Sequence, residues 1–343
     1  MRSDGLFDLQ VNGYGGVDFN DEAITPGDLD RALAAMVEDG VTACLPTLIT
    51  APAEVLGARL EALDRAVGQS RLGPVMVPGY HLEGPFLNPA QGYAGCHPPA
   101  AIIAPDPALL EREAALLTRP ILLVTLAPER EGAEALIRRA RAMGAVVSLG
   151  HTAASAADVA RAVDAGATLS THLGNGLAQM LPKFANPLMA QLADDRLCAS
   201  FIADGIHIPR DVLRVFIRAK QPERCLLVTD GTAASHAAPG RYRLAGMTIE
   251  RSPDGSVRVP GGTTLAGSSL TLDAAVRNVV AWGIADADAA LRMASAAPTA
   301  LLAPALAAHS IALADSEVEW STDLRPMRVK AGPIAISAGS ALN

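Results

Sequence analysis

The sequence predicts a (β/α)8 barrel with a small β appendage, on the basis of three observations. Eight short apolar, β-branched runs are present, an Ala-, Leu- and Arg-rich helical stretch follows most of them, and polar residues collect where the runs end. Apolar runs of this length suit parallel strands that are buried on both faces. Eight strands alternating with helices are typical of a barrel, and a doubly wound open sheet is the main alternative.

The expected elements can be placed in order along the chain. The strands lie at Phe7–Val11, Thr42–Leu48, Val75–His81, Ile121–Leu126, Ala145–Leu149, Thr168–His172, Ala199–Ala203 and Cys225–Thr229. Helices are expected at Gly27–Asp39, Pro52–Val67, Pro107–Leu117, Glu131–Met143, Ala154–Ala165 and Arg210–Ala219. Asp28, Asp106 and Ser155 stand where helix N-caps are expected.

Two regions interrupt this alternation. After the eighth strand, Arg241–Arg251 and Ser256–Val259 predict two short strands around the turn Ser252–Gly255, which makes a β-hairpin insertion at about residues 240–260. A helix at Ser269–Trp282 would then close the barrel. We therefore expect a barrel over residues 1–306 and a C-terminal β appendage over residues 307–343.

Composition narrows the class of protein. The chain has 343 residues, of which 50% are hydrophobic and 19% charged, so it can bury a sizeable core and does not resemble a disordered chain. A net charge of −8 and only 3% aromatic residues disfavour a nucleic-acid partner or an anionic membrane partner.

Targeting signals and cysteines point to a cytoplasmic protein. No run of eighteen apolar residues occurs, so we expect no ordinary transmembrane helix. The first residues, MRSDGLFDLQ, contain no apolar signal-peptide stretch. The four cysteines are scattered and form no CxxC pair, which favours a reducing compartment.

Polar residues at the strand ends predict a metal site. In a barrel, functional residues gather at the carboxyl ends of the strands. Glu83, His151 and His172 would converge there from the third, fifth and sixth strands. One carboxylate, two imidazoles and an open position form a normal catalytic zinc set, and Asp230 would lie opposite as a proton acceptor. Each residue alone also has a structural explanation, as a hydrogen-bonded histidine, a turn aspartate or a salt-bridge glutamate.

Ten short motifs, in this order, resemble the N-acetylglucosamine-6-phosphate deacetylases of the amidohydrolase superfamily. The resemblance runs from Phe7 to about Leu301. The motifs are DLQVNGYGGVDFND, LPTLIT, HLEGPFLN, GCHPP, VTLAPE, LGHTAA, THLGN, IADGIH, VTDG and LAGSSLTL. Each motif alone is weak, and the ordered set is a strong signal.

The resemblance implies a role for each site residue. Glu83, His151 and His172 match the family's metal ligands, and Asp230 matches its catalytic aspartate. His97, in GCHPP, matches a histidine that contacts the sugar and orients or polarises the acetyl group.

Further matching positions concern the substrate and a neighbouring subunit. Asn175 and the backbone of Gly176 match positions that hold polar groups of the substrate. His207 matches a histidine that reaches into the site of the neighbouring subunit, so the resemblance implies a homodimer.

Strand one distinguishes one-metal from two-metal members. Many amidohydrolases carry His-x-His there and a lysine on strand four, and hold two metals. Here Gln10 and Asn12 occupy the secondary metal-site positions, and none of the three lysines is on the fourth strand. The resemblance therefore implies one divalent ion per chain, with zinc the best guess for nitrogen and oxygen ligands.

Three departures from the family pattern qualify this expectation. The chain starts only a few residues before strand one, so we expect the family's small β-sandwich to be reduced or missing. The tail Ala307–Asn343 lacks the Gly-rich final hairpin. The loop Gly176–Pro187 lacks the arginine expected for the sugar phosphate, and Lys183 is its nearest cation, able to act as a point charge but not as a bidentate fork. Arg241 and Arg243 are further candidates.

The expected function is metal-dependent removal of the acetyl group from an N-acetyl amino sugar. N-acetylglucosamine 6-phosphate is the expected substrate, and glucosamine 6-phosphate and acetate are the expected products. The alternatives are a non-phosphorylated or epimeric N-acetylhexosamine, another amidohydrolase reaction, and a non-catalytic protein that has kept the barrel. Retention of Glu83, His151, His172 and Asp230 together argues against the last of these.

Overall fold

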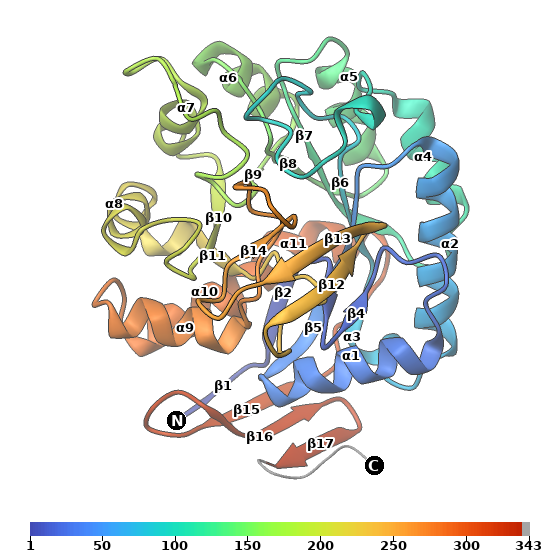
Figure 1. The fold of residues 1–343 in the computed structure, drawn as a ribbon, viewed down its shortest axis with the longest axis vertical. Helices are drawn as coiled ribbons and strands as arrows, with labels where there is room; N and C mark the ends of the chain where they lie inside the picture. Colours follow the sequence, from blue (N-terminus) through green and yellow to red (C-terminus); the bar gives the residue numbers. More distant parts are fainter. Residues whose placement is uncertain (338–343) are drawn as a thin grey trace.

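A closed parallel barrel forms the body of the protein (Figure 1). The computed structural model describes residues 1–337. The barrel strands are β2 (Leu6–Val11), β5 (Val41–Ile49), β6 (Tyr80–Glu83), β7 (Ile121–Leu126), β8 (Val146–Leu149), β9 (Leu169–Ser170), β10 (Cys198–Ile202) and β11 (Cys225–Val228), neighbouring one another in this order. A parallel bridge between Val11 and Gly231 joins the first strand to the last and closes the barrel. The predicted barrel is confirmed, and the open sheet is excluded.

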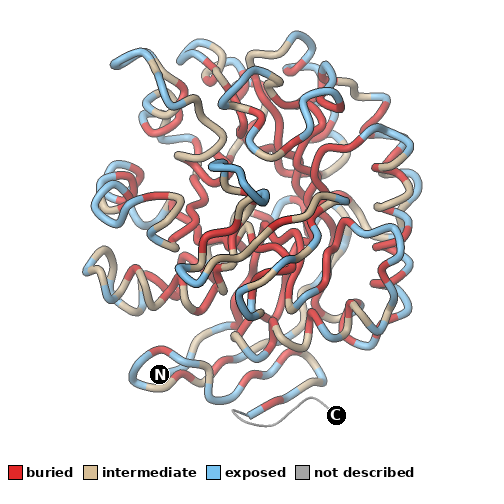
Figure 2. Tube along the Cα trace, in the orientation of Figure 1, coloured by how far each residue is buried: buried red, intermediate tan, exposed pale blue. Residues whose placement is uncertain are grey.

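Helices surround the strands. In Figure 2 the strands of the barrel are mostly buried, whereas buried and exposed residues alternate along the surrounding helices. They are α1 (Pro26–Glu38), α2 (Ala53–Gln69), α4 (Pro107–Ala115), α5 (Ala133–Ala142), α6 (Ala156–Ala165), α7 (Pro187–Ala193), α8 (Arg210–Lys220), α9 (Leu272–Ala281), α10 (Ala287–Ala294) and α11 (Ala296–Ala308). In α5, Ala133, Leu136, Ile137 and Ala140 are buried and repeat at helical spacing. Full burial of a leucine or isoleucine side chain stabilises the fold by about 1.5–3 kcal/mol.

Two of the three predicted N-caps are confirmed. Asp106 accepts a hydrogen bond from the Ala108 N–H, and Ser155 caps α6. The prediction for Asp28 is wrong, because Thr25 caps α1 and Asp28 is the third helical residue of its capping box. The two side chains each accept from the other's backbone N–H at 3.1 Å.

The third strand is shifted from its predicted position. A short helix, α3 (Gly73–Met76), occupies the start of the predicted Val75–His81 run, and the strand begins at Tyr80. Pro74 lies in the first turn of α3, where its missing N–H has no cost. The shift brings Glu83 into the strand as its last residue.

The insertion after β11 has three strands, so the predicted pair is wrong in detail. The strands are β12 (Gly240–Leu244), β13 (Met247–Arg251) and β14 (Val257–Arg258). Ala245 and Gly246 have φ values of 50° and 86°, which suits a two-residue hairpin turn. Asp18 Oδ2 accepts from the Ala245 N–H at 2.7 Å, and Arg59 donates to the Ala245 carbonyl at 3.1 Å. The hairpin tip is thereby fixed to the segment after the first barrel strand and to α2.

A separate antiparallel sheet joins the two ends of the described chain. Its order is β1 (Arg2–Ser3), β15 (Ser316–Trp320), β16 (Pro326–Ala331) and β17 (Ile334–Ser337). Trp320 is buried, and its Nε1 donates to Ser3 Oγ at 2.8 Å. A Cβ at Gly40, at the end of the α1 segment, would lie 3.0 Å from the Trp320 ring. This sheet contains most of the predicted appendage. Residues 338–343 of the appendage lie outside the described residues.

Shorter elements and one apolar stretch complete the description. The strands β3 (Gly13–Tyr14) and β4 (Val17–Asp18) pair with each other, and Pro99–Ala101 and Pro222–Arg224 form 3-10 turns. By length and composition alone, Ala287–Ala308 could cross a membrane. Because 56% of its most apolar window is buried in the structure, and α10 and α11 pack on the barrel strands, the core helices of a globular protein explain it equally well.

Candidate active site

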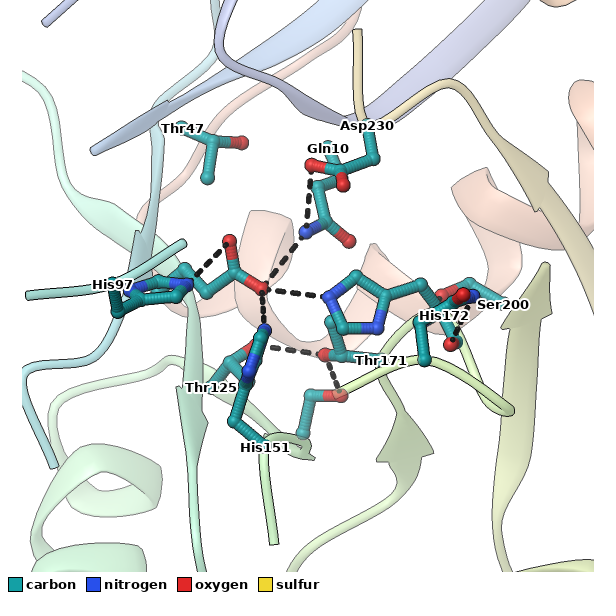
Figure 3. Close-up of polar contacts among 12 residues, drawn as sticks. Gln10, Thr47, His97, Thr125, His151, Thr171, His172, Ser200 and Asp230 are labelled. Atoms are coloured by element: carbon teal, nitrogen blue, oxygen red, sulfur yellow. Dashed lines mark hydrogen bonds and ion pairs between the residues drawn. The ribbon is translucent and has the colours of Figure 1, made fainter. Parts of the chain in front are cut away.

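Glu83 is the centre of a buried cluster at the mouth of the barrel. Its Oε1 lies 3.0 Å from His172 Nε2 and 3.4 Å from His151 Nε2, and its Oε2 lies 3.8 Å from His97 Nε2. The three imidazoles come from different parts of the chain and converge on one point (Figure 3). Among the described residues, Glu83, His97 and His151 offer ligand atoms within 4.8 Å of one another, the arrangement of a metal site.

The contacts of His151 test whether a metal ion fits. Its Nδ1 lies 2.6 Å from the carbonyl oxygen of Tyr93, so Nδ1 carries the proton and Nε2 of the neutral ring presents a lone pair. That lone pair faces a carboxylate oxygen of Glu83. Two acceptors in contact need a positive charge between them, supplied by a proton or a cation. A carboxylate with several imidazole nitrogens is a donor set that a divalent metal fits.

Of the other two histidines, His97 has its ring held from behind, whereas His172 is held through its backbone. His97 Nδ1 lies 2.8 Å from Thr50 Oγ1. The backbone N–H of His172 donates to Ser200 Oγ at 2.8 Å, while His172 Nδ1 is buried without a hydrogen-bond partner among the described residues. Fixed ring orientations of this kind are what a metal site requires of its histidines.

Three site residues follow their strands in a left-handed backbone conformation. The φ values are 51° for His151, 29° for His172 and 47° for Asp230. Non-glycine residues rarely adopt this region, and the cost is of order 1–3 kcal/mol each. Such strain clusters at functional sites, where the surrounding structure holds it in place.

Amides from the first strand connect the cluster to Asp230. Gln10 Nε2 donates to Glu83 Oε1 at 3.0 Å and to Asp230 Oδ1 at 3.3 Å, and Asn12 Nδ2 donates to Asp230 Oδ1 at 2.7 Å. The side chains at the secondary metal-site positions therefore direct N–H groups at carboxylates. In this arrangement they act as hydrogen-bond donors, which supports a single metal position.

Burial and mutual charge set the ionisation of the two carboxyl groups. Burial, and then the negative charge of Glu83, raise the pKa of Asp230 to about 6. Burial opposes ionisation of Glu83, but the His151 and His172 imidazoles beside it hold its pKa well below the ordinary value. Glu83 is thus an ionised carboxylate, whereas Asp230 can exchange a proton near neutral pH.

The imidazoles respond differently to the same surroundings. Burial, reinforced by the neighbouring His151, lowers the pKa of His97 to about 3, so this ring is neutral. Burial also favours neutral His172, but its hydrogen bond to Glu83 and that carboxylate's charge raise its pKa overall. Without a metal, a proton on His172 can supply the positive charge that Glu83 requires.

A polar layer supports the cluster from inside the barrel. His81 Nε2 lies 2.7 Å from Thr125 Oγ1. Thr125 Oγ1 in turn lies 2.7 Å from Thr171 Oγ1 (Figure 3). Burial lowers the pKa of His81 to about 4, so the ring is neutral. The layer links β6 and β7 to the residue after β9, beside the Glu83 cluster.

The remaining predicted residues differ in how closely they join the cluster. Asn175 Nδ2 donates to the carbonyl of His172 at 3.0 Å. A Cβ at Gly176, whose φ is 61°, would lie 2.7 Å from His151 Nδ1, so only glycine fits there. His207 Nδ1 pairs with Asp204 Oδ2 at 2.6 Å. Lys183 is exposed, and its Nζ lies 5.2 Å from the Phe184 ring centroid, with no described contact to the cluster.

Three supporting groups were missed by sequence reasoning. Thr50 and Ser200 resemble ordinary strand residues, and Tyr93 contributes only its carbonyl oxygen, which no side-chain pattern can reveal. The one available signal was the position of Thr50 at the end of the LPTLIT motif.

Curated relatives match most of the chain. An N-acetylgalactosamine-6-phosphate deacetylase from Escherichia coli O157:H7 is 36% identical over 297 residues, which are 86% of this chain and 76% of the relative. An N-acetylglucosamine-6-phosphate deacetylase from Bos taurus is 35% identical over 310 residues, covering 87% of this chain and 73% of the relative. No family model matches the chain.

Solved structures of the same kind share the fold. A variant N-acetyl-D-glucosamine-6-phosphate deacetylase from Mycobacterium smegmatis, in complex with N-acetyl-D-glucosamine-6-phosphate, has a TM-score of 0.85 at 30% identity over 96% of this chain and 85% of its own. The N-acetylglucosamine-6-phosphate deacetylase from Pasteurella multocida has a TM-score of 0.84 at 27% identity over 98% of this chain and 86% of its own. The chain therefore belongs to the N-acetylglucosamine-6-phosphate and N-acetylgalactosamine-6-phosphate deacetylase family of the amidohydrolase superfamily.

Proposed function

We propose that the protein hydrolyses the acetyl amide of an N-acetylhexosamine 6-phosphate and releases acetate. The expected substrate is N-acetylglucosamine 6-phosphate, and the product is then glucosamine 6-phosphate. One observation carries this proposal: Glu83, with three imidazoles around it, is linked through Gln10 to Asp230 in a barrel mouth. The family membership narrows the reaction of such a site to amide hydrolysis.

Glu83, His151 and His172 are the proposed ligands of one divalent ion per chain. Zinc is the expected ion, given a carboxylate and two imidazoles. When bound, such an ion polarises a carbonyl group and lowers the pKa of water. His97 is the alternative third ligand, because its Nε2 lies 3.8 Å from Glu83 Oε2.

Asp230 is the proposed general base and then the general acid. Both amide donors, Asn12 and Gln10, bind its Oδ1, so Oδ2 is the oxygen available to take a proton from the attacking water. The protonated carboxyl then gives this proton to the departing sugar nitrogen. A pKa of about 6 suits a group that must accept and release a proton near neutral pH.

His97 is proposed to stabilise negative charge on the acetyl oxygen. The Thr50 hydroxyl donates to Nδ1 in this arrangement, which places the ring proton on Nε2, facing the cluster. Preorganised donors of this kind are most effective where charge develops in the transition state. Asn175 and the Gly176 backbone lie beside His172 and His151 and are the proposed partners of the sugar's polar groups.

The sugar epimer and the phosphate distinguish the alternative substrates. The relatives named for the two epimers are 36% and 35% identical to this chain, so N-acetylgalactosamine 6-phosphate is the epimeric alternative. The proposed phosphate contact is Lys183, with Arg241, Arg243 and a partner's His207 as further candidates. Lys183 is exposed, and this observation favours a free N-acetylhexosamine as the second candidate substrate.

We propose that the protein is a homodimer. The exposed apolar side chains of Met180, Phe184 and Met189, from the loop before α7 and from α7 itself, and of Val212 and Val215 from α8 are the proposed contact face. The helices α7 and α8 pack against each other, and His207 lies directly before α8. A dimer that covers this face would bring His207 to the subunit boundary.

The cytoplasm is the proposed location. All four cysteines are free in the structure, as expected in a reducing compartment.

A comparison of four sugars tests the proposed reaction. Acetate release would be measured for N-acetylglucosamine 6-phosphate, N-acetylgalactosamine 6-phosphate and the two free sugars, with metal-loaded protein. We expect the highest kcat/KM for N-acetylglucosamine 6-phosphate. A kcat/KM for a free sugar equal to or above that of the phosphorylated sugars would overturn the phosphate requirement. Absence of acetate release from all four would overturn the deacetylase proposal.

A further inference from the structure

The carboxylate of Glu129 binds the two loops that carry His151 and Asn88. Glu129 lies in the VTLAPE motif, just after β7, and has no role in the reaction described above. Its Oε1 accepts from Asn88 Nδ2 and from the Ala153 N–H, both at 2.7 Å. Its Oε2 accepts a short hydrogen bond from the Thr152 hydroxyl. Three donors therefore use both carboxylate oxygens.

All three donor residues are next to His151, either in the sequence or through a backbone hydrogen bond. Thr152 and Ala153 follow it directly, and the backbone N–H of Asn88 donates to the His151 carbonyl at 3.1 Å. Asn88 thus connects the two residues, because its backbone N–H contacts His151 and its side chain contacts Glu129. Thr152 is 1% exposed, so its hydroxyl cannot exchange Glu129 for water without local opening.

The backbone of His151 needs such support. Its φ of 51° is unfavourable for a residue with a Cβ, and such conformations persist only where neighbouring contacts over-determine them. The Tyr93 carbonyl fixes the ring of His151, but the Glu129 contacts fix the peptide units on its carboxyl side. Hydrogen bonds to an ionised carboxylate are about twice as strong as neutral ones, so Glu129 is well suited to this task.

We propose that Glu129 is a positioning residue that holds the His151 backbone in its left-handed conformation and thereby aims His151 Nε2 at the metal position. This inference rests on the proposed metal role of His151. It predicts that Glu129 affects metal affinity more than it affects the stability of the metal-free fold. A simple tie between loops would do the reverse.

Substitutions at Glu129 separate the two roles. Glu129→Ala removes both acceptors, and Glu129→Gln keeps one acceptor oxygen for three donors. Glu131→Gln is the matched control, since Glu131 is exposed and lies two residues further along the same segment. Zn²⁺ affinity would be measured by chelator competition, with Tm of the metal-free protein and kcat/KM measured beside it.

We expect the affinity for Zn²⁺ to fall about 10- to 100-fold in Glu129→Ala, and by less in Glu129→Gln, because outer-shell partners of metal ligands have effects of this size. The control should stay within about twofold of wild type. Zn²⁺ affinity within about twofold of wild type in Glu129→Ala would overturn the inference, whatever happens to Tm.

If Glu129→Ala fails to fold, the more conservative variants Thr152→Val and Glu129→Gln test the role of Glu129. Thr152→Val removes one donor with little change of shape, and its effect on Zn²⁺ affinity should be non-additive with that of Glu129→Gln, because both break the same contact. Strict additivity would count against the inference.

His151→Ala provides the separate test of the metal site. Wild-type protein that binds no Zn²⁺, or a His151→Ala variant that keeps it, overturns both proposals. Loss of Zn²⁺ in His151→Ala alone, with Glu129→Gln and Thr152→Val unaffected, overturns only the role of Glu129.

Discussion

Asn12 Nδ2 donates a hydrogen bond to Asp230 Oδ1 across 2.7 Å, and this contact distinguishes the two oxygens of the carboxylate. Gln10 approaches the same oxygen. None of the hydrogen bonds described for residues 1–337 uses Oδ2, which leaves that atom for the exchange of a proton with water and substrate. The first strand thus orients the proposed base as well as lining the barrel.

Asp230→Asn is expected to lower kcat by about 10²–10⁴-fold or more, because the group has to act in two successive proton transfers. Asparagine tolerates the left-handed backbone at this position, so the fold and the metal content should be retained. The measurement is kcat at saturating substrate with metal analysis of the same sample. If Asp230 only stabilised the turn into Gly231, the variant would keep most of its activity, so kcat within about tenfold of wild type would reject the catalytic assignment.

The metal proposal predicts about one divalent ion per chain in purified wild-type protein. The His151→Ala, His172→Ala double variant should lose it, because two of three ligands are gone. The single variant His97→Ala should keep the ion and lose activity. Wild-type stoichiometry in the double variant would eliminate the site, and loss of the ion in His97→Ala would instead identify His97 as a ligand beside Glu83 and His151.

Lys183→Ala should raise KM for N-acetylglucosamine 6-phosphate about ten- to a hundred-fold and leave the free sugar almost unchanged. The basis is the loss of one charge-assisted hydrogen bond, worth roughly 1.5–3 kcal/mol. Arg241→Ala and Arg243→Ala are the matched variants on the inserted sheet. An increase in KM confined to either of these would assign the phosphate contact there and remove Lys183 from the site.

The dimer proposal predicts that Phe184→Asp shifts the protein toward monomer in light scattering. Phe184 is 74% exposed, and a charge on an apolar contact face has to be desolvated on association. Leu116→Asp, directly after α4 and away from α7 and α8 (Figure 1), is the control, since Leu116 is 45% exposed and should not alter the assembly. A wild-type protein that is monomeric and fully active would remove the proposed cross-subunit role of His207.

Asp18 predicts a pH dependence of stability that is independent of the metal ligands. Burial raises the pKa of this carboxyl from 3.8 to about 6 in the folded state, so the folded protein holds the proton more tightly than the unfolded chain. Its contribution is therefore fully present below about pH 4 and is lost as pH rises through about 6, by up to about 3 kcal/mol.

Urea unfolding of wild type and Asp18→Asn at pH 4 and pH 7 checks this sign. The difference in unfolding free energy between the two proteins should move against wild type as pH rises. Asp21→Asn, an exposed neighbour, should show no such change. A constant difference between wild type and Asp18→Asn across this range would contradict the shifted pKa.

Features fixed by neighbouring residues were the ones that the sequence could predict. Ser155 was identified as an N-cap because the cap and the first turn of α6 are contiguous. Glu83, His151 and His172 were expected to converge because parallel strand ends must meet at one side of a barrel, and Glu83 Oε1 lies 3.4 Å and 3.0 Å from the two imidazoles. The turn at Ala245 and Gly246 was missed because alanine is an unusual residue at positive φ, and the hairpin tip is held by distant Asp18.

Long-range contacts were out of reach of sequence reasoning. The pairing of Arg2 with Glu319 in the small sheet joins the two ends of the described chain, and nothing near Arg2 signals it. The hydrogen bond from Thr50 to His97 likewise depends on how a distant loop folds over the barrel. Sequence motifs predicted which residues would take part in the site, but not which groups would hold them in place.

The left-handed backbone at His151, His172 and Asp230 has a consequence for attempts to make the protein more heat-resistant. Glycine or asparagine relieves such a conformation, so a selection for thermal survival alone would find gains at these three positions. Every such gain would discard an imidazole or a carboxylate from the mouth of the barrel. Screens for thermostable variants should therefore measure catalytic activity in the same round, because at these positions the most stable variants would be the least active ones.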